Sequence, residues 1–77
     1  MYTNEILEEI KLLNQFDLSS TSRGLKVHAS EASDEAVAAA KRLFDKGLTD
    51  LVDGGYLTEL GLVAAGHAQS LARILSA

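Results

Sequence analysis

Residues 48–61 read LTDLVDGGYLTELG, and this stretch decides how the chain folds. Two short apolar runs flank Asp53-Gly54-Gly55, where glycine can supply the positive φ that tight hairpin turns require. The stretch therefore predicts a β-hairpin with its tip at residues 52–55.

Thr58 ends the second strand of this hairpin and also starts a helix. A Thr side chain caps a helix well, and Glu59 in the first turn favours the positive end of the helix. An apolar stripe at helical spacing follows, and we expect it to face the core. Its members are Leu60, Ala64, Ala68, Leu71 and Leu75, with Val63, His67 and Ile74 beside them. Gly61 and Gly66 each weaken the helix but would let another helix approach closely.

Upstream of the hairpin, the sequence predicts two more helices and one short strand. Ser33 is a favourable N-cap for an amphipathic helix over residues 33–46, and Thr3 is another for a helix over residues 4–15. Between them, residues 25–28 alternate apolar and polar side chains, as a half-buried strand does. The order helix, strand, helix, hairpin, helix predicts an α+β fold that is helix-rich with a small antiparallel sheet.

The first helix is expected to be amphipathic. Ile6, Ile10 and Leu13 form its apolar stripe, and we expect Glu8 and Glu9 to face solvent. Four consecutive hydroxyl residues follow in a polar loop, which ends the helix.

A chain of 77 residues predicts one domain, residues 1–77, with a modest core. It contains no Cys, which excludes disulfides and thiolate metal sites and is typical of a reducing compartment. His28 and His67 lie far apart without a second ligand at metal spacing, so we expect neither a metal site nor a cofactor. Small domains without such staples often depend on a partner chain, and we expect a homodimer or a protein partner.

No pattern in the sequence is typical of a catalytic site. No nucleophile stands beside a base, and no phosphate loop with its lysine is found. No apolar stretch approaches the ~20 residues of a membrane span. The first residues lack a basic segment followed by an apolar run, so we expect no signal peptide. We therefore expect a non-enzymatic, cytoplasmic protein without membrane contact.

The distribution of charge limits where nucleic acid could bind. The formal net charge is −4, whereas DNA affinity depends on neutralising phosphates. Residues 22–47 nevertheless hold five of the seven basic residues, against four carboxylates. These candidate nucleic-acid-binding residues are Arg23, Lys26, Lys41, Arg42 and Lys46. The alternative is a solvated helix face on which Lys41 pairs with Asp45 at the i, i+4 spacing.

Residues 56–61, YLTELG, resemble the end of the wing in bacterial winged-helix regulators. There, the strand after the wing often ends in Leu-Thr-x-x-Gly and starts a C-terminal helix, so the resemblance implies a DNA-binding regulator of transcription. A winged helix has two helices between its first strand and its wing. Residues 29–47 hold one helix and at most a turn, so the resemblance implies a reduced winged helix. A structural hairpin followed by a Thr cap is the alternative.

Residues 43–48 (LFDKGL), residues 53–61 (DGGYLTELG) and His67-Ala68 carry a second resemblance. They are similar, with nearly the whole chain, to a small family of uncharacterised bacterial proteins of this size. Members of that family have been labelled DNA-binding or inhibitor-of-DNA-binding-like. The resemblance implies DNA as a partner.

Two functions of different class remain open. The first is a nucleic-acid-associated regulator that uses the helix at 33–46 and the hairpin tip. The second is a protein-interaction module or homodimer, in which small residues of the last helix let a second backbone come close. The candidate interface residues are Gly61, Leu62, Ala65, Gly66, Gln69 and Arg73. Alternatively, the glycines accept the first helix of the same chain.

Overall fold

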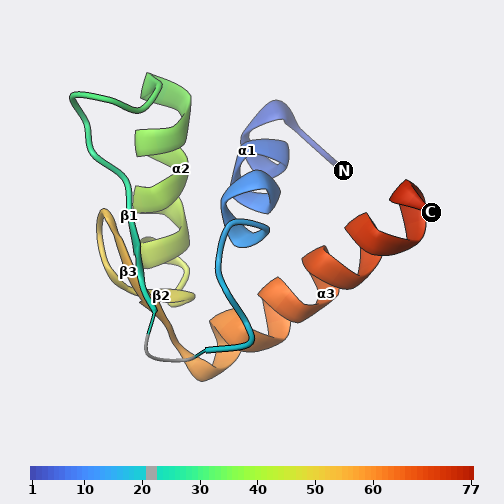
Figure 1. Ribbon diagram of the computed structural model, residues 1–77. Coiled ribbons are helices and arrows are strands. Elements are labelled where there is room, and N and C mark those ends of the chain that lie inside the picture. Colours follow the sequence, from blue (N-terminus) through green and yellow to red (C-terminus); the bar gives the residue numbers. More distant parts are fainter. Residues whose placement is uncertain (21–22) are drawn as a thin grey trace.

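The computed structural model describes residues 1–20 and 23–77, and its elements follow the predicted order (Figure 1). The helices are α1 (Asn4–Leu13), α2 (Asp34–Asp45) and α3 (Glu59–Ser76). The strands are β1 (Leu25–Lys26), β2 (Thr49–Leu51) and β3 (Gly54–Leu57). The helix-rich α+β class is confirmed, although β1 is shorter than the predicted strand at 25–28. Residues 21–22 of the predicted polar loop lie outside the described residues.

Each helix begins at the Thr or Ser that was predicted to cap it. The side-chain oxygens of Thr3, Ser33 and Thr58 each accept a hydrogen bond of 3.1 Å from the backbone N–H three residues on. This bond satisfies an N–H group that has no partner within the helix. The three caps therefore fix where each helix starts.

The predicted hairpin is formed by β2 and β3. Its turn glycines both have positive φ, +123° at Gly54 and +79° at Gly55. Gly54 also lies against β1, because a Cβ atom there would be 2.3 Å from the carbonyl oxygen of Leu25. Glycine at this position therefore lets β1 pair closely with β3, and the antiparallel sheet has the order β1-β3-β2.

One helix, α2, lies between β1 and β2. The residues before it, 29–32, form a turn in which the N–H of Ala32 donates to the carbonyl of His28 at 2.8 Å. The prediction of one helix and a turn in this segment is confirmed.

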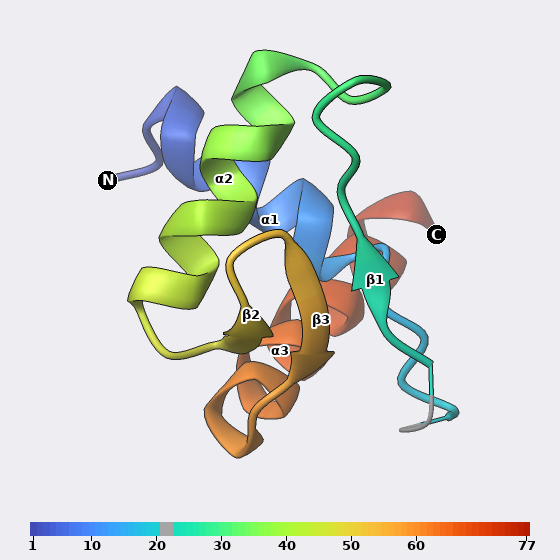
Figure 2. The same ribbon diagram turned by 90° about the vertical axis from the view of Figure 1, so that its left-hand side faces the viewer.

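In Figure 1, α1 and α2 lie side by side, and α3 runs outward from their lower ends. Figure 2, turned by 90°, shows the sheet in front and α3 behind it. Apolar side chains from the three helices, and from the segments that follow α1 and β1, form the core. They are Leu12, Leu13, Phe16, Val27, Ala39, Ala40, Leu43 and Ala65.

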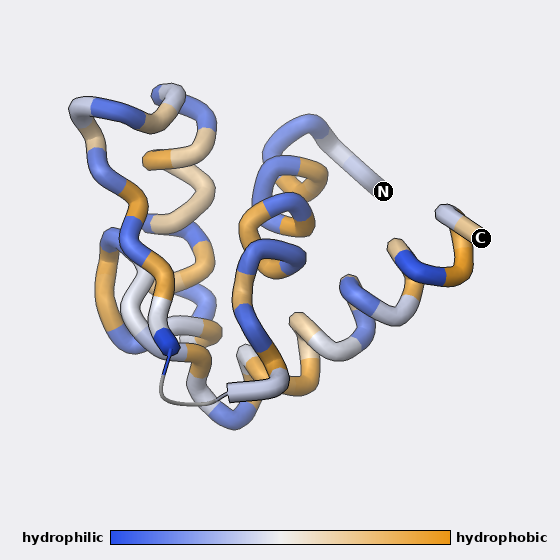
Figure 3. The backbone as a smooth tube through the Cα atoms, in the orientation of Figure 1, coloured by the Kyte–Doolittle hydropathy of each residue, from blue (hydrophilic) through white to orange (hydrophobic). Residues whose placement is uncertain are grey.

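α3 contributes to this core as far as Ala68. Ala64, Ala65 and Ala68 pack into it, whereas residues 73–77 are exposed. Figure 3 shows apolar stretches in this projecting part of the helix. In the part of the chain that the structure describes, no helix is long and apolar enough to cross a bilayer.

Candidate interaction surface

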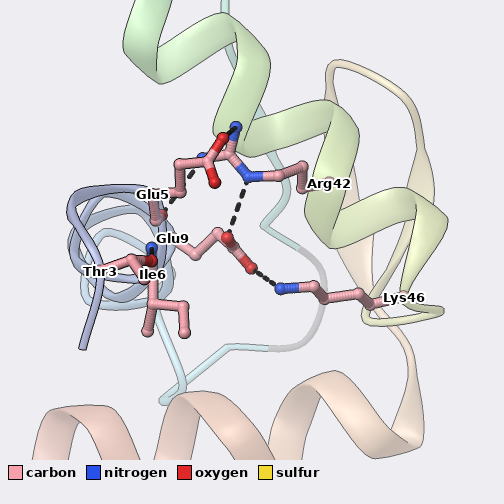
Figure 4. A network of polar contacts seen from close by, with 6 residues as sticks. All are labelled: Thr3, Glu5, Ile6, Glu9, Arg42 and Lys46. Carbon is pink, nitrogen blue, oxygen red and sulfur yellow. Dashed lines mark hydrogen bonds and ion pairs between the residues drawn. The ribbon is translucent and has the colours of Figure 1, made fainter. Parts of the chain in front are cut away.

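An ion-pair network joins α1 to α2 (Figure 4). Nε of Arg42 donates to Oε2 of Glu9 at 2.9 Å, and Nζ of Lys46 donates to the other carboxylate oxygen. The second arm of the Arg42 guanidinium donates to the backbone carbonyl of Glu5 at 3.1 Å. The Glu5 carboxylate lies 3.7 Å from the same guanidinium, so two acids one helical turn apart face two cations one helical turn apart.

The prediction that Glu9 faces solvent is wrong, since the residue is 5% exposed. Neighbouring helix residues point about 100° apart, so Glu8 can face outward while Glu9 faces α2. Burial by itself raises the pKa of Glu9, but the hydrogen bonds and charges of Lys46 and Arg42 outweigh it and leave that pKa below its ordinary value. The carboxylate is therefore charged and fully paired.

Most of the predicted nucleic-acid-binding cations have carboxylate partners in the structure. Lys41 pairs with Asp45 at 2.8 Å, as the sequence alternative proposed. Lys26 pairs with Asp53 at the hairpin tip. Arg42 pairs with Glu9 and, at 3.7 Å, with Glu5, and Lys46 also pairs with Glu9, so four of the five cations have a carboxylate partner. The fifth, Arg23, is exposed in the loop before β1.

These cations also point in different directions. Lys26 and Lys41 line a shallow groove between α2 and the hairpin tip, together with Asp34 and Asp53. Arg42 instead turns toward α1 (Figure 4). The fold thus divides the basic residues of segment 22–47 between two surfaces of mixed charge.

Three of the six predicted interface residues are buried or hydrogen-bonded against other segments of their own chain. A Cβ at Gly61 would lie 1.9 Å from the backbone oxygen of Leu48, so the connection after α2, and not α1, occupies the space beside this glycine. Ala65 is fully buried. Nε2 of Gln69 donates to the backbone carbonyls of Leu13 and Phe16 at 3.1 and 2.8 Å. These three residues are thus occupied by the rest of the fold.

The other three lie on the outer flank of α3. Leu62 borders a small pocket with Phe16 and Tyr56. Gly66 has open space where a Cβ would be. Arg73 donates to the hydroxyl of Ser70 on the same helix at 3.4 Å. None of these contacts covers the solvent-facing side of this flank.

A different face of α3 carries large apolar side chains into solvent. The exposed fractions are 58% for Leu60, 57% for Val63, 46% for Leu71 and 71% for Ile74. His67 is exposed in the middle of the same face. On an ideal helix these five residues fall within about 80° of arc. We call them the α3 stripe.

The prediction of a core-facing stripe on this helix is right for Ala64 and Ala68 and wrong for Leu60, Leu71 and Leu75, which are exposed. The core takes the adjacent side of α3, where Gly61, Ala65 and Ala68 allow the helix to approach the body closely. Larger residues such as Leu60 and Leu71 are left outside. α3 therefore has two apolar faces, and its own chain covers one of them.

A model of one protein family matches residues 1–76, and its description is a family of unknown function (DUF5669). The chain belongs to this family. No curated protein and no solved structure matches the chain. Membership in DUF5669 confirms the resemblance to an uncharacterised family and assigns no function.

For this DUF5669 chain, a signal for the uncovered face was present in the sequence. Apolar residues occupy more of the α3 circumference than one contact with the body can cover, and Glu59 and Arg73 are the only fully charged side chains on the helix. A helix that is apolar over most of its circumference is usually buried over most of it. In the described residues, no group of His, Asp or Glu side chains that could hold a metal ion competes with the stripe as a candidate site.

Proposed function

We propose that the chain is a protein-interaction domain that binds a helix of its partner through the α3 stripe. The observation that carries this proposal is the exposure of Leu60, Val63, Leu71 and Ile74 on one face. Contiguous apolar surface of this kind is uncommon on monomers and marks interaction sites.

The shape of the stripe favours a helical partner. Its residues follow i, i+3 and i, i+4 spacing along a straight helix, and such ridges fit the grooves of a second helix. From Leu60 to Ile74 the stripe extends about 21 Å, since an α-helix rises about 1.5 Å per residue. A partner helix of four turns would cover it.

DNA binding is the second candidate, supported by the wing-like hairpin and by the basic residues of segment 22–47. Its physical support is weaker, because the carboxylates of Glu9, Asp45 and Asp53 already pair with four of the five cations. A phosphate would have to displace these partners. The net charge of −4 opposes the approach of a polyanion.

Site-specific photo-cross-linking in the native host tests the proposal. A photoreactive amino acid at position 63 or 71 should form an adduct with a defined protein, identified by mass spectrometry. The same amino acid at position 66, on another side of the same helix, is the matched control and should form far less. Equal yields at positions 63, 66 and 71 would overturn the proposal.

A further inference from the structure

The spacing of residues along the α3 stripe indicates which molecule covers it. We propose that a second copy of this chain covers it, with the two α3 helices antiparallel about a two-fold axis at His67. This inference rests on the proposed function and specifies its partner.

The spacing between the stripe residues is the same from either end of α3. Its members are residues 60, 63, 67, 71 and 74, so the steps between them are 3, 4, 4 and 3. In an antiparallel pair centred on His67, Leu60 lies opposite Ile74 of the partner subunit, and Val63 lies opposite Leu71 of the partner subunit. A two-fold interface requires this reciprocity, since each contact must occur twice.

His67 is the only polar member of the stripe, and it stands at the centre. A neutral imidazole has one donor and one acceptor, so His67 and the partner's His67 can hydrogen-bond to each other across the axis. A polar side chain at one position of an apolar seam fixes register, because any shift leaves it without a partner. The position of His67 therefore favours the symmetric register.

Charge complementarity selects the antiparallel orientation. Glu59 lies in the first turn of α3 and Arg73 in the last. Both lie on the same flank of the stripe on an ideal helix. Antiparallel pairing brings Glu59 toward the partner's Arg73 and opposes the two helix dipoles. In a parallel two-fold pair this flank lies on opposite sides of the seam in the two copies, so Glu59 would not meet the partner's Arg73.

A lipid surface fits the stripe less well than a second copy does. Helices that lie on membranes have polar faces rich in Lys and Arg. α3 has one basic residue, Arg73, and the chain has a net charge of −4. Anionic lipid would repel this chain.

Sedimentation equilibrium with the wild-type chain tests the association. The mass should rise from one chain toward two as the protein concentration increases. Val63→Glu should lower the association constant at least about tenfold. Val52→Glu is the matched control, since Val52 is 50% exposed at the hairpin tip; it should leave association unchanged.

Single cysteines test the register, because the natural chain has none. With oxidised glutathione, His67→Cys should form a disulfide-linked dimer. A mixture of Leu60→Cys and Ile74→Cys chains should cross-link, whereas Leu60→Cys alone should not. Cross-linking of Leu60→Cys alone at the rate of the mixture would overturn the antiparallel register.

Charge reversal tests the orientation. Glu59→Arg should weaken association by placing two cations together, and Arg73→Glu in the same chain should restore it. If neither change alters the association constant, the proposed arrangement is contradicted.

The failure of this inference can be separated from the failure of the proposed function. A wild-type chain that stays monomeric up to about 1 mM, equivalent to about −4 kcal/mol, overturns the homodimer. If position 63 then cross-links to a different protein, the proposed function stands without the homodimer. Binding of the monomer to anionic vesicles, abolished by Val63→Glu, would assign the stripe to lipid and overturn both.

Discussion

Nε of Arg42 donates a hydrogen bond of 2.9 Å to the carboxylate of Glu9, a residue 33 positions earlier in the chain. This bond crosses from α2 to α1, where the two helices lie side by side (Figure 1). Lys46 donates to the other oxygen of the same carboxylate. The helix pair is thus held by paired charge as well as by the apolar core.

Glu9→Gln should destabilise the fold. The change removes the negative charge that Arg42 and Lys46 share, while it keeps the size of the side chain. Loss of a hydrogen-bonded charge at a buried site should cost about 1–3 kcal/mol of unfolding free energy. Urea denaturation followed by circular dichroism measures this cost.

Glu8→Gln is the control for that substitution. Glu8 pairs with Lys11 on the exposed side of the same helix. An exposed pair of this kind contributes less than about 1 kcal/mol. Equal losses of unfolding free energy in the two variants would show that the α1–α2 ion pairs contribute no more than an exposed pair does.

Stability should fall on acidification, and Glu9 should carry part of the loss. Its pKa in the folded protein lies below the ordinary value of 4.5, so the unfolded chain binds the proton first as the pH falls. The stabilisation is complete above about pH 4.5 and is lost as the pH passes through the folded-state pKa. Urea midpoints at pH 7, 5, 4 and 3 should therefore decline.

In Glu9→Gln the decline should be shallower. It should not vanish, because the pKa values of Asp17 and Asp53 are also lowered, first by hydrogen bonds from Ser19 and Lys26 respectively. Parallel curves for the variant and the wild type would mean that Glu9 does not contribute to acid sensitivity.

Two glycines of α3 should respond to alanine in opposite directions. Gly61→Ala would put a Cβ 1.9 Å from the backbone oxygen of Leu48, so the helix must move. We expect a loss of about 1–3 kcal/mol. Gly66→Ala meets no atom within 4 Å and should gain up to about 1 kcal/mol from helix propensity.

Thermal and urea denaturation of both glycine variants provide the measurement. A loss of stability in Gly66→Ala that grows with protein concentration would point to a partner backbone at Gly66, as the sequence interpretation proposed. That result would move the interface away from the α3 stripe.

Duplex DNA should bind weakly to this chain. Fluorescence anisotropy at about 150 mM salt should show no saturable binding below about 10 μM, because non-specific affinities already lie near this range for basic proteins. Submicromolar binding that weakens steeply with salt, and that is reduced by Lys26→Glu, would restore the DNA hypothesis. A substitution at Arg42 would be unsuitable for this test, since Arg42 also holds α1.

Local chemistry explains why much of the fold could be predicted. The caps at Ser33 and Thr58 and the turn at Gly54 depend on residues within a few positions, and the structure confirms each of them. The burial of Glu9 could not be predicted in this way, because its partner Arg42 is distant in sequence.

The α3 stripe was misjudged for a related reason. Periodicity correctly predicted an apolar helix, but it could not decide which of two apolar sides the body would cover. Close packing at Gly61 and Ala65 decided this. Leu60 and Leu71 were therefore assigned to the core although both are exposed.

Thr58 gives the projecting helix a fixed base. Its hydroxyl accepts from the N–H of Gly61 and donates to the carbonyl of Gly47 at 2.7 Å, while its own N–H donates to Leu48. α3 consequently acts as a lever anchored to the end of α2. A rotation of about 10° at Gly61 would displace Leu75 by about 4 Å, since roughly 21 Å of helix separate them. Substitutions in the connection after α2 can therefore move Leu71 and Ile74 at the far end of α3 without contacting either residue.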